Sequence, residues 1–296
     1  MIKKMLFFAL TGSALIFSGC GNEREQSLKV NLSVREDIPV KKSKDLLLFG
    51  VSGIYSFPQT YRLYKPFIDY LSKTTGKNIK LVQRPDYAEL SGLLKEGKID
   101  FARIAAGAYV GFDKEAGAEI LAVESKREEK YYRSFIIVRS DSPIKEFGDL
   151  RGKSFAFVDP NSLSGYYFAT YLISKAGFDV RTFFSRVVWS RSHDNSIRLV
   201  YEREADGACA ASYILESSPL KEKIRIIGKS PPLFRGPMLA GKSMKPELRG
   251  RIKRILLNMH RNDEGKNALK SLKINKFISG KDSDYDFARE IAGLTK

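Results

Sequence analysis

Residues 154–177, SFAFVDPNSLSGYYFATYLISKAG, carry the clearest fold signal in the chain. The aromatic and β-branched run at 154–158 predicts a buried strand, and the Asp-Pro-Asn sequence at 159–161 is typical of a turn. Ser162 and Ser164 are good N-caps for the helix that follows. A strand that runs through such a turn into a helix presents free N–H groups and the positive end of a helix dipole. The segment therefore fits either an anion-binding junction or an ordinary turn whose serines only cap the helix.

Predicted strands and helices alternate on both sides of this segment. Apolar runs before it predict strands at 46–51, 79–83, 99–104, 119–123 and 132–139, with helical periodicity at 61–73 and 87–96. The second series has strands at 154–158, 186–189 and 207–211 and a helix at 193–203. Further helices are predicted at 246–259, 263–272 and 285–292, in a tail with little strand that we expect to pack back onto the first series. The alternation predicts an α/β fold with mostly parallel sheets.

Two breaks in this pattern suggest that the chain forms two lobes, the second inserted within the first. The breaks are a Ser-Asp-Ser-Pro sequence near 139–143 and a Ser-Pro-Pro sequence near 228–236, which would be the crossing segments. The predicted lobes are therefore 46–138 plus 233–296 for the first and 139–232 for the second. A ligand cleft is expected between them, where the strands end.

The N-terminus has the features of a lipoprotein signal peptide over residues 1–19. Two lysines precede an apolar run at 6–17 that is too short to span a bilayer, and small residues lead into Cys20. We predict that Cys20 becomes the lipidated first residue on the periplasmic or extracellular face; the alternative is a short uncleaved anchor. Residues 20–45 are polar and aperiodic and are predicted to be a flexible tether.

Composition excludes several classes of function. The net charge is +17, but Lys and Arg are scattered evenly, and with an export signal this favours a basic surface facing a membrane over nucleic-acid binding. The second of the two cysteines, Cys209, lies in an apolar run and is predicted to be buried, without a disulfide. There are two histidines and no metal-binding, P-loop or GxGxxG motif, so neither a metal nor a cofactor is predicted.

Two further junctions carry polar or aromatic residues where a strand ends. The sequence Ser-His-Asp-Asn-Ser at 192–196 follows a predicted strand and again combines N-capping residues with His193. Two such junctions in one lobe can converge on a single anion. Tyr109 follows a strand of the other lobe, where it either reaches the ligand or fills the seam between the lobes.

Several of these segments resemble the phosphate/phosphite/phosphonate-binding proteins of ABC importers. The strongest match is DLRGK at 149–153, then FAF at 155–157 running into DPNSLSGY at 159–166, followed by Ser-His-Asp at 192–194. Weaker matches keep the family order and extend the resemblance to about residues 46–275; they lie at 86–90, 97–102, 108–110, 132–134 and 205–208. The resemblance implies a two-lobe periplasmic-binding-protein fold of type II, with two crossovers and a cleft that closes on an oxyanion.

The resemblance also implies a set of ligand-binding residues: Ser162, Leu163 through its backbone N–H, Ser164, His193, Tyr109 and, with less support, Tyr55. Leu163 departs from the polar residue usual in the family. Positions 211–213 lack the carboxylate of members that accept an amino-bearing ligand, which disfavours 2-aminoethylphosphonate. Arg103 and Arg191 replace expected apolar or glycine residues. Each either contacts the anion or is solvated at the cleft rim, and we favour the rim.

The predicted function is therefore capture of a small phosphorus oxyanion, namely phosphate, phosphite or an alkylphosphonate. The carrier would be a monomeric, lipid-anchored protein that delivers the anion to an ABC permease without covalent chemistry. Two alternatives remain open: a ligand sensor of the same fold that acts on a membrane signalling partner, and a binder of another small anion such as a carboxylate or sulfonate. An enzyme is the least favoured, because no activated nucleophile or metal cluster is recognisable.

Overall fold

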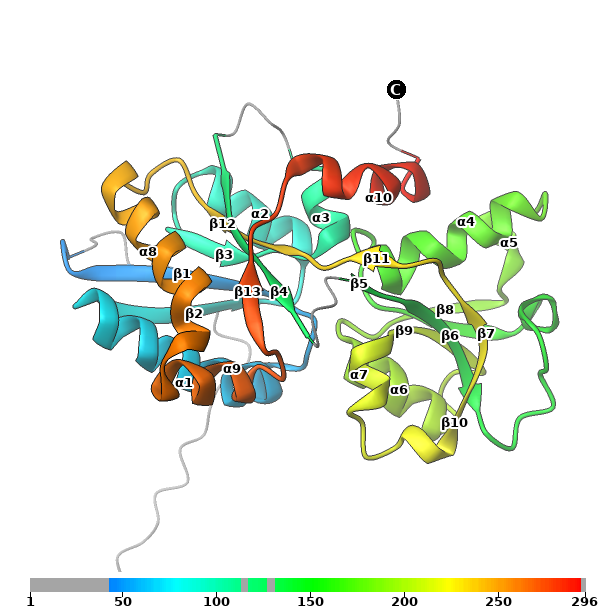
Figure 1. Ribbon diagram of the computed structural model, residues 1–296. Helices are drawn as coiled ribbons and strands as arrows, with labels where there is room; N and C mark the ends of the chain where they lie inside the picture. Colours follow the sequence, from blue (N-terminus) through cyan, green and yellow to red (C-terminus); the bar gives the residue numbers. More distant parts are fainter. Residues whose placement is uncertain (1–42, 113–116, 127–130, 294–296) are drawn as a thin grey trace, which may run out of the picture. The chain divides into compact units, whose positions relative to one another are not determined.

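The computed structural model describes residues 43–112, 117–126 and 131–293, which form two α/β sheets with flanking helices (Figure 1). The predicted signal peptide, Cys20 and nearly all of the predicted tether lie outside the described residues. Within the described part, no helix combines the length and the apolar character needed to cross a membrane.

The first sheet has six strands in the order β13-β4-β12-β3-β1-β2. Three of its strands are parallel, and β12 lies antiparallel between β3 and β4. The strands are β1 (Leu46–Ser52), β2 (Asn78–Arg84), β3 (Phe101–Arg103), β4 (Glu119–Ser125), β12 (Pro237–Ala240) and β13 (Lys276–Ile278). The helices of this lobe are α1 (Phe57–Thr75), α2 (Tyr87–Lys95), α3 (Ala106–Val110), α8 (Pro246–Asn258), α9 (Asp263–Ser271) and α10 (Asp286–Ile291).

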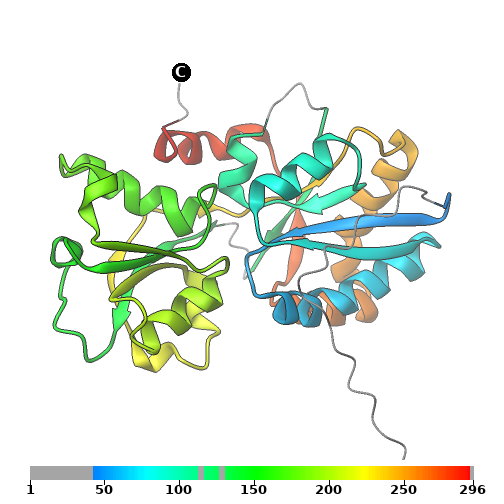
Figure 2. The ribbon, with the colours of Figure 1, turned by 180° about the vertical axis from the view of Figure 1, so that it is seen from behind.

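An aromatic core fixes α1 on one face of this sheet, with α2 on the other (Figure 2). Phe49 of β1 stacks on Phe101 of β3 at 4.7 Å between ring centroids, and Phe67 of α1 packs against Phe49 at 5.6 Å. The helix begins four residues earlier than its apolar periodicity predicts. Its first turn contains Pro58, whose missing N–H costs nothing there.

The second sheet has five strands in the order β10-β6-β9-β7-β8. It repeats the plan of the first: three parallel strands, then an antiparallel strand, then a strand antiparallel to that one. The strands are β6 (Ser134–Arg139), β7 (Ser154–Phe157), β8 (Arg186–Trp189), β9 (Gly207–Ala211) and β10 (Ile224–Lys229). Its main helices are α4 (Phe168–Lys175), α5 (Val180–Phe183), α6 (His193–Tyr201) and α7 (Ser212–Glu216).

The two crossing segments pair with each other. β5 (Tyr131–Tyr132) and β11 (Leu233–Phe234) form a two-stranded antiparallel ribbon. The strand predicted at 132–139 is therefore two strands, and β6 belongs to the second sheet, where it pairs with both β9 and β10. The chain changes sheet before Ser134, earlier than the break near 139–143 that the sequence suggests.

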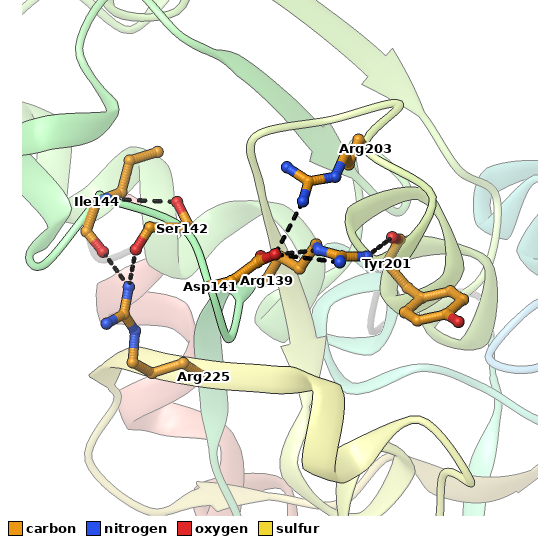
Figure 3. Close-up of polar contacts among 7 residues, drawn as sticks. All are labelled: Arg139, Asp141, Ser142, Ile144, Tyr201, Arg203 and Arg225. Carbon is orange, nitrogen blue, oxygen red and sulfur yellow. Dashed lines mark hydrogen bonds and ion pairs between the residues drawn. The ribbon is translucent and has the colours of Figure 1, made fainter.

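The residues 139–143 instead form a turn that is fixed within the second lobe (Figure 3). The Arg139 guanidinium donates to both carboxylate oxygens of Asp141, at 2.7 and 3.1 Å, and Arg203 donates to the same carboxylate at 2.8 Å. Arg225 donates to two backbone carbonyls at the end of the turn, both at 2.6 Å. Residues 139–143 are therefore held to the rest of the second lobe by hydrogen bonds and ion pairs and are unsuited to act as a crossing between lobes.

Candidate functional site

A small cavity lies where the strands of both sheets end. Its walls include four of the six predicted ligand-binding residues, Ser162, Leu163, Ser164 and His193. The rest of its lining is Ile54, Tyr87, Arg103, Ala105, Ala106, Tyr132, Tyr213 and Gly236. The two junctions that the sequence places in the second lobe therefore do converge on one point.

The first junction is a helix N-terminus that opens with one π-helical turn, Leu163–Tyr167, before α4. Ser162 is its N-cap, and the Ser162 Oγ accepts a hydrogen bond from the N–H of Gly165 at 3.0 Å. Gly165 allows the turn to lie close to the preceding strand, since a Cβ there would stand 2.5 Å from that of Val158. The N–H groups of Leu163 and Ser164 belong to the first turn, where no helix carbonyl precedes them.

The turn before this helix is held by Asp159, which is fully buried. Its carboxylate accepts from the N–H of Asn161 at 2.7 Å and from the N–H of Tyr87, in the first lobe, at 3.0 Å. Burial raises the pKa of Asp159, and these two N–H donors oppose that shift. The Asp-Pro-Asn turn thus also links the two lobes.

The second junction presents the imidazole of His193, which is only 3% exposed. Its Nδ1 accepts from the N–H of Ala211 at 3.1 Å, so the neutral ring must carry its proton on Nε2. Nε2 lies 3.4 Å from the Oγ of Ser164. Burial lowers the pKa of His193 from 6.5 to about 4; the positive charge of Arg103 adds to this shift and Asp194 opposes it. At neutral pH the cavity therefore contains an uncharged N–H donor.

The lobes touch each other around this cavity. Asp194 accepts from both the N–H and the hydroxyl of Ser56, at 2.9 and 2.7 Å. The N–H of His193 donates to the carbonyl of Ile54 at 3.1 Å. Gly107 lies directly against the first junction: a Cβ there would stand 2.3 Å from the carbonyl oxygen of Asn161.

We expected Arg103 to be solvated at the cleft rim, but the side chain is buried, with 3% of the residue exposed. It forms an ion pair with the buried Glu124 at 3.3 Å, and Glu124 also accepts from the hydroxyl of Tyr64 at 3.2 Å. The short strand β3 ends at this residue, which directs the guanidinium toward the cavity that it lines. Arg191 is exposed with a φ of +65° and is not among the cavity residues.

The two predicted tyrosines lie outside the cavity wall. The Tyr109 hydroxyl donates to Asp282 at 2.8 Å, and its ring packs on Tyr285, in a cluster that also contains Leu163. Burial raises the pKa of Tyr109. Tyr55 lines an adjoining hollow together with Arg103, and burial raises its pKa as well. We predicted that Tyr109 either reaches the ligand or fills the seam between the lobes, and these contacts match the second possibility.

Sequence reasoning missed several residues of the wall and of the adjoining hollows. Tyr87, Tyr132 and Tyr213 line the cavity, and Arg235 lines the hollows next to it. The family matches at 86–90 and 132–134 include Tyr87 and Tyr132, and Tyr213 lies in the segment 211–213, but neither motif nor spacing assigned these tyrosines to the site. Cys209 is buried as predicted. The described residues contain no group of three or more His, Cys, Asp or Glu side chains placed to hold a metal.

Two sheets of like plan, joined by two crossing segments and meeting at a cavity, define the periplasmic-binding-protein fold. Residues 49–285 match the family model described as ABC transporter, phosphonate, periplasmic substrate-binding protein. The chain belongs to this family, whose members are periplasmic proteins that bind substrates for transport and work with a permease.

Relatives and solved structures agree with this assignment. The chain is 25% identical over 262 residues to a phosphonates-binding periplasmic protein of Escherichia coli K12, covering 85% of this chain and 77% of the relative. A binding protein of an ABC phosphonate transporter from Pseudomonas aeruginosa superposes with a TM-score of 0.79 at 24% identity, covering 84% and 86% of the two chains. PhnD1 from Prochlorococcus marinus, in complex with methylphosphonate, gives 0.75 at 18% identity, covering 84% and 97%. The two solved structures support the fold.

Proposed function

We propose that the chain captures a phosphonate or phosphate in this cavity and delivers it to the permease of an ABC importer. The observation that carries the proposal is the convergence of the helix N-terminus at Ser162–Ser164 with the side chain of His193, whose Nε2 lies 3.4 Å from the Oγ of Ser164 in a buried site. A tetrahedral PO₃ group needs several fixed donors, and helix N-termini supply them with little ordering cost.

Each group of the first junction has a distinct role in this proposal. The N–H groups of Leu163 and Ser164 face the phosphoryl oxygens, and the Ser164 hydroxyl donates to one of them. The Ser162 Oγ accepts from Gly165, and its proton is shared between the neighbouring Tyr87 hydroxyl and the ligand in this proposal. Leu163 needs only its backbone, so the loss of the polar side chain usual in the family is compatible with binding.

We propose that the site performs no covalent chemistry. A serine nucleophile needs a base that takes its proton, and the imidazole nitrogen near Ser164 is Nε2. That nitrogen already carries the ring proton, because Nδ1 is occupied as an acceptor from Ala211. His193 therefore donates to the ligand and does not activate Ser164.

The remaining features of the proposal concern the membrane. We propose that cleavage before Cys20 and its lipidation anchor a monomeric mature protein at the membrane that contains the permease. The tether and the basic surface suit that position, because anionic lipid headgroups attract Lys and Arg side chains.

Calorimetric titration of the purified full chain with methylphosphonate, phosphate, phosphite and sulfate tests the proposal. We expect binding of one or more phosphorus oxyanions, and weakening by at least about tenfold in Ser164→Ala and in His193→Ala, because each loses a donor to a charged ligand. Ser279→Ala, at an exposed position, and His260→Ala, outside the cavity, are matched controls. Unchanged affinity in both site variants would reject the site, and binding of sulfate alone would favour the other-anion alternative.

A further inference from the structure

Arg235 is a buried cation without a partner among the described residues. It follows β11 directly, is 4% exposed, and its guanidinium lies over the ring of Tyr213 at 4.3 Å. Its Nε is buried without a hydrogen bond, whereas its terminal nitrogens are not among the buried atoms that lack a partner and face the hollows that Arg235 lines. Buried arginines are normally paired, because an uncompensated charge in a protein interior is costly.

Three other arginines of the described chain, the buried Arg103 and the half-buried Arg225 and Arg249, do not share this condition. The Nε atoms of Arg103, Arg225 and Arg249 also lack partners, but their terminal nitrogens donate to carboxylates or carbonyls. Arg103 in particular is neutralised by Glu124. Arg235 therefore stands out as a charged group held in place by stacking alone.

The tyrosines around Arg235 do not supply the missing negative charge. Burial raises the pKa of Tyr213, on which the guanidinium is stacked, although both nearby arginines oppose the shift. Burial also raises the pKa of Tyr55. Both phenols are neutral at physiological pH, and they contribute ring surface and hydroxyl groups rather than a counter-ion.

The space beside Arg235 adjoins the phosphoryl cavity. Arg235 lines two hollows that adjoin the cavity. The first hollow shares Tyr132 and Tyr213 with the cavity, and the second shares Ile54, Arg103 and Tyr213 with it. Gly236 itself lines the cavity, and a Cβ there would stand 2.9 Å from a terminal nitrogen of Arg103. The guanidinium of Arg103 therefore lies against the residue that follows Arg235.

The charge of these hollows is predominantly positive. Among the described residues, one is lined by Arg103, Lys126, Arg235 and Lys273 and by one carboxylate, that of Glu124, which is already bound to Arg103 and Tyr64. The other has three cations against the exposed Glu216. Such surroundings repel an ammonium group and attract a second anion.

We propose that the ligand has two anionic ends, a phosphoryl group held at Ser162–Ser164 and His193 and a second acid group held by Arg235. The planar guanidinium donates in a fork that fits a carboxylate or a second phosphoryl group. A short carbon linker lies along the rings of Tyr132 and Tyr213, which connect the two places. This inference rests on the proposed function, and it names the substrate class as phosphonocarboxylates or diphosphonates.

Calorimetry on the full chain with matched ligands tests the second acid group. Phosphonoacetate and its carboxyl methyl ester share the phosphoryl group and the carbon linker and differ in the charge of the tail; methylenediphosphonate tests a phosphoryl tail, and methylphosphonate has none. We expect the ligand with the charged tail to bind at least about tenfold more tightly than the ester, a difference typical of one charge-assisted pair. Equal affinities for the acids and the ester overturn the inference, and the better of the two acids identifies the second group.

An Arg235→Gln variant assigns the effect to the arginine. We expect it to lose the preference for the charged tail and to bind methylphosphonate within about twofold of the wild type, because the phosphoryl donors are intact. Arg191→Gln, at an exposed arginine outside the cavity, should keep the preference. A preference that survives in a folded Arg235→Gln rejects the assignment. If that variant does not fold, the comparison of acid and ester in the wild type still decides.

Failure of this inference and failure of the proposed function look different. If only the inference is wrong, the phosphonates bind with equal affinity and Ser164→Ala still weakens all of them. If the proposed function is wrong, none of the phosphorus oxyanions binds, or the Ser164 and His193 variants change nothing.

Discussion

The two sides of the binding region use opposite physical means. The side built by the second lobe presents N–H groups, hydroxyls and a neutral imidazole, and none of its described residues that line the cavity carries a formal charge. The carboxylates of Asp159 and Asp194 lie at the two junctions, where N–H and hydroxyl groups donate to them. The side built by the first lobe and the second crossing segment holds two buried guanidiniums, one of them paired. The contrast shows how one site separates affinity from selectivity. Under the proposed function, the fixed dipoles would bind the PO₃ group, and the charged side would discriminate by what is attached to it.

Breaking the ion pair on the charged side should give the largest effect. Arg103→Met leaves the carboxylate of Glu124 buried without its cation, which we expect to lower the free energy of unfolding by about 3–5 kcal/mol. Urea unfolding of the purified chain measures it. Arg191→Met, at an exposed position, should change stability by less than about 0.5 kcal/mol. A loss below about 1 kcal/mol for Arg103→Met would contradict the view that this side depends on the buried pair.

On the neutral side, the buried His193 should make the free energy of unfolding depend on pH. The pKa of His193 is lowered from 6.5 to about 4, so below pH 6.5 the unfolded chain binds a proton that the folded chain refuses. The contribution of His193 to stability is therefore complete above pH 6.5 and declines as the pH falls toward 4. The loss amounts to about 3 kcal/mol.

Comparison of the wild type with His193→Gln isolates this contribution, because glutamine does not titrate. The difference in unfolding free energy between pH 7 and pH 4.5 should be larger in the wild type. Identical pH profiles of the two proteins would mean that His193 is not held neutral by burial.

A single added methyl group at Gly107 should weaken the binding of every ligand, because it separates the first lobe from the first junction. Gly107→Ala places a Cβ within 2.3 Å of the Asn161 carbonyl oxygen and 2.5 Å of the Leu163 nitrogen, so the first lobe can no longer lie against the junction. We expect all ligands to bind about ten- to hundredfold more weakly, whatever the charge of their tails. Gly92→Ala, where a Cβ meets nothing within 4 Å, is the matched control and should bind normally.

The smallest effect is expected at Tyr109. Tyr109→Phe removes the hydrogen bond to Asp282 and should cost about 1 kcal/mol of stability, while affinity for methylphosphonate stays within about twofold. Thermal unfolding and calorimetry separate the two quantities. A tenfold loss of affinity would instead return Tyr109 to the ligand-binding residues.

The sequence-based prediction succeeded where structure is decided locally. The strand, turn and helix of residues 154–177 each have their own signals, and so does the junction at His193, so the neutral side of the site could be assembled from the sequence. The fold class followed from the alternation of strands and helices and from the family resemblance, and both are confirmed.

The charged side escaped prediction because tertiary contacts create it. Arg235 follows a Pro-Pro pair and the two-residue strand β11, and nothing in the sequence around it indicates burial. Arg103 ends a three-residue strand and would be expected in solvent until Glu124 is known to face it. The strand β12 has only four residues, yet it lies in the middle of the first sheet because the crossing segment delivers it there.

The ribbon of β5 and β11 has a mechanical consequence. Because Leu233 pairs with Tyr132 and Phe234 with Tyr131, the two connections between the lobes form one strap and must flex in step. Arg235 directly follows β11, so a ligand bound to its guanidinium would act on the β5–β11 ribbon as well. If Arg235 binds the second acid group, the same residue would contribute both to the choice of ligand and to the movement of the crossing segments. A substrate without a second charge would then occupy the site without acting on those segments.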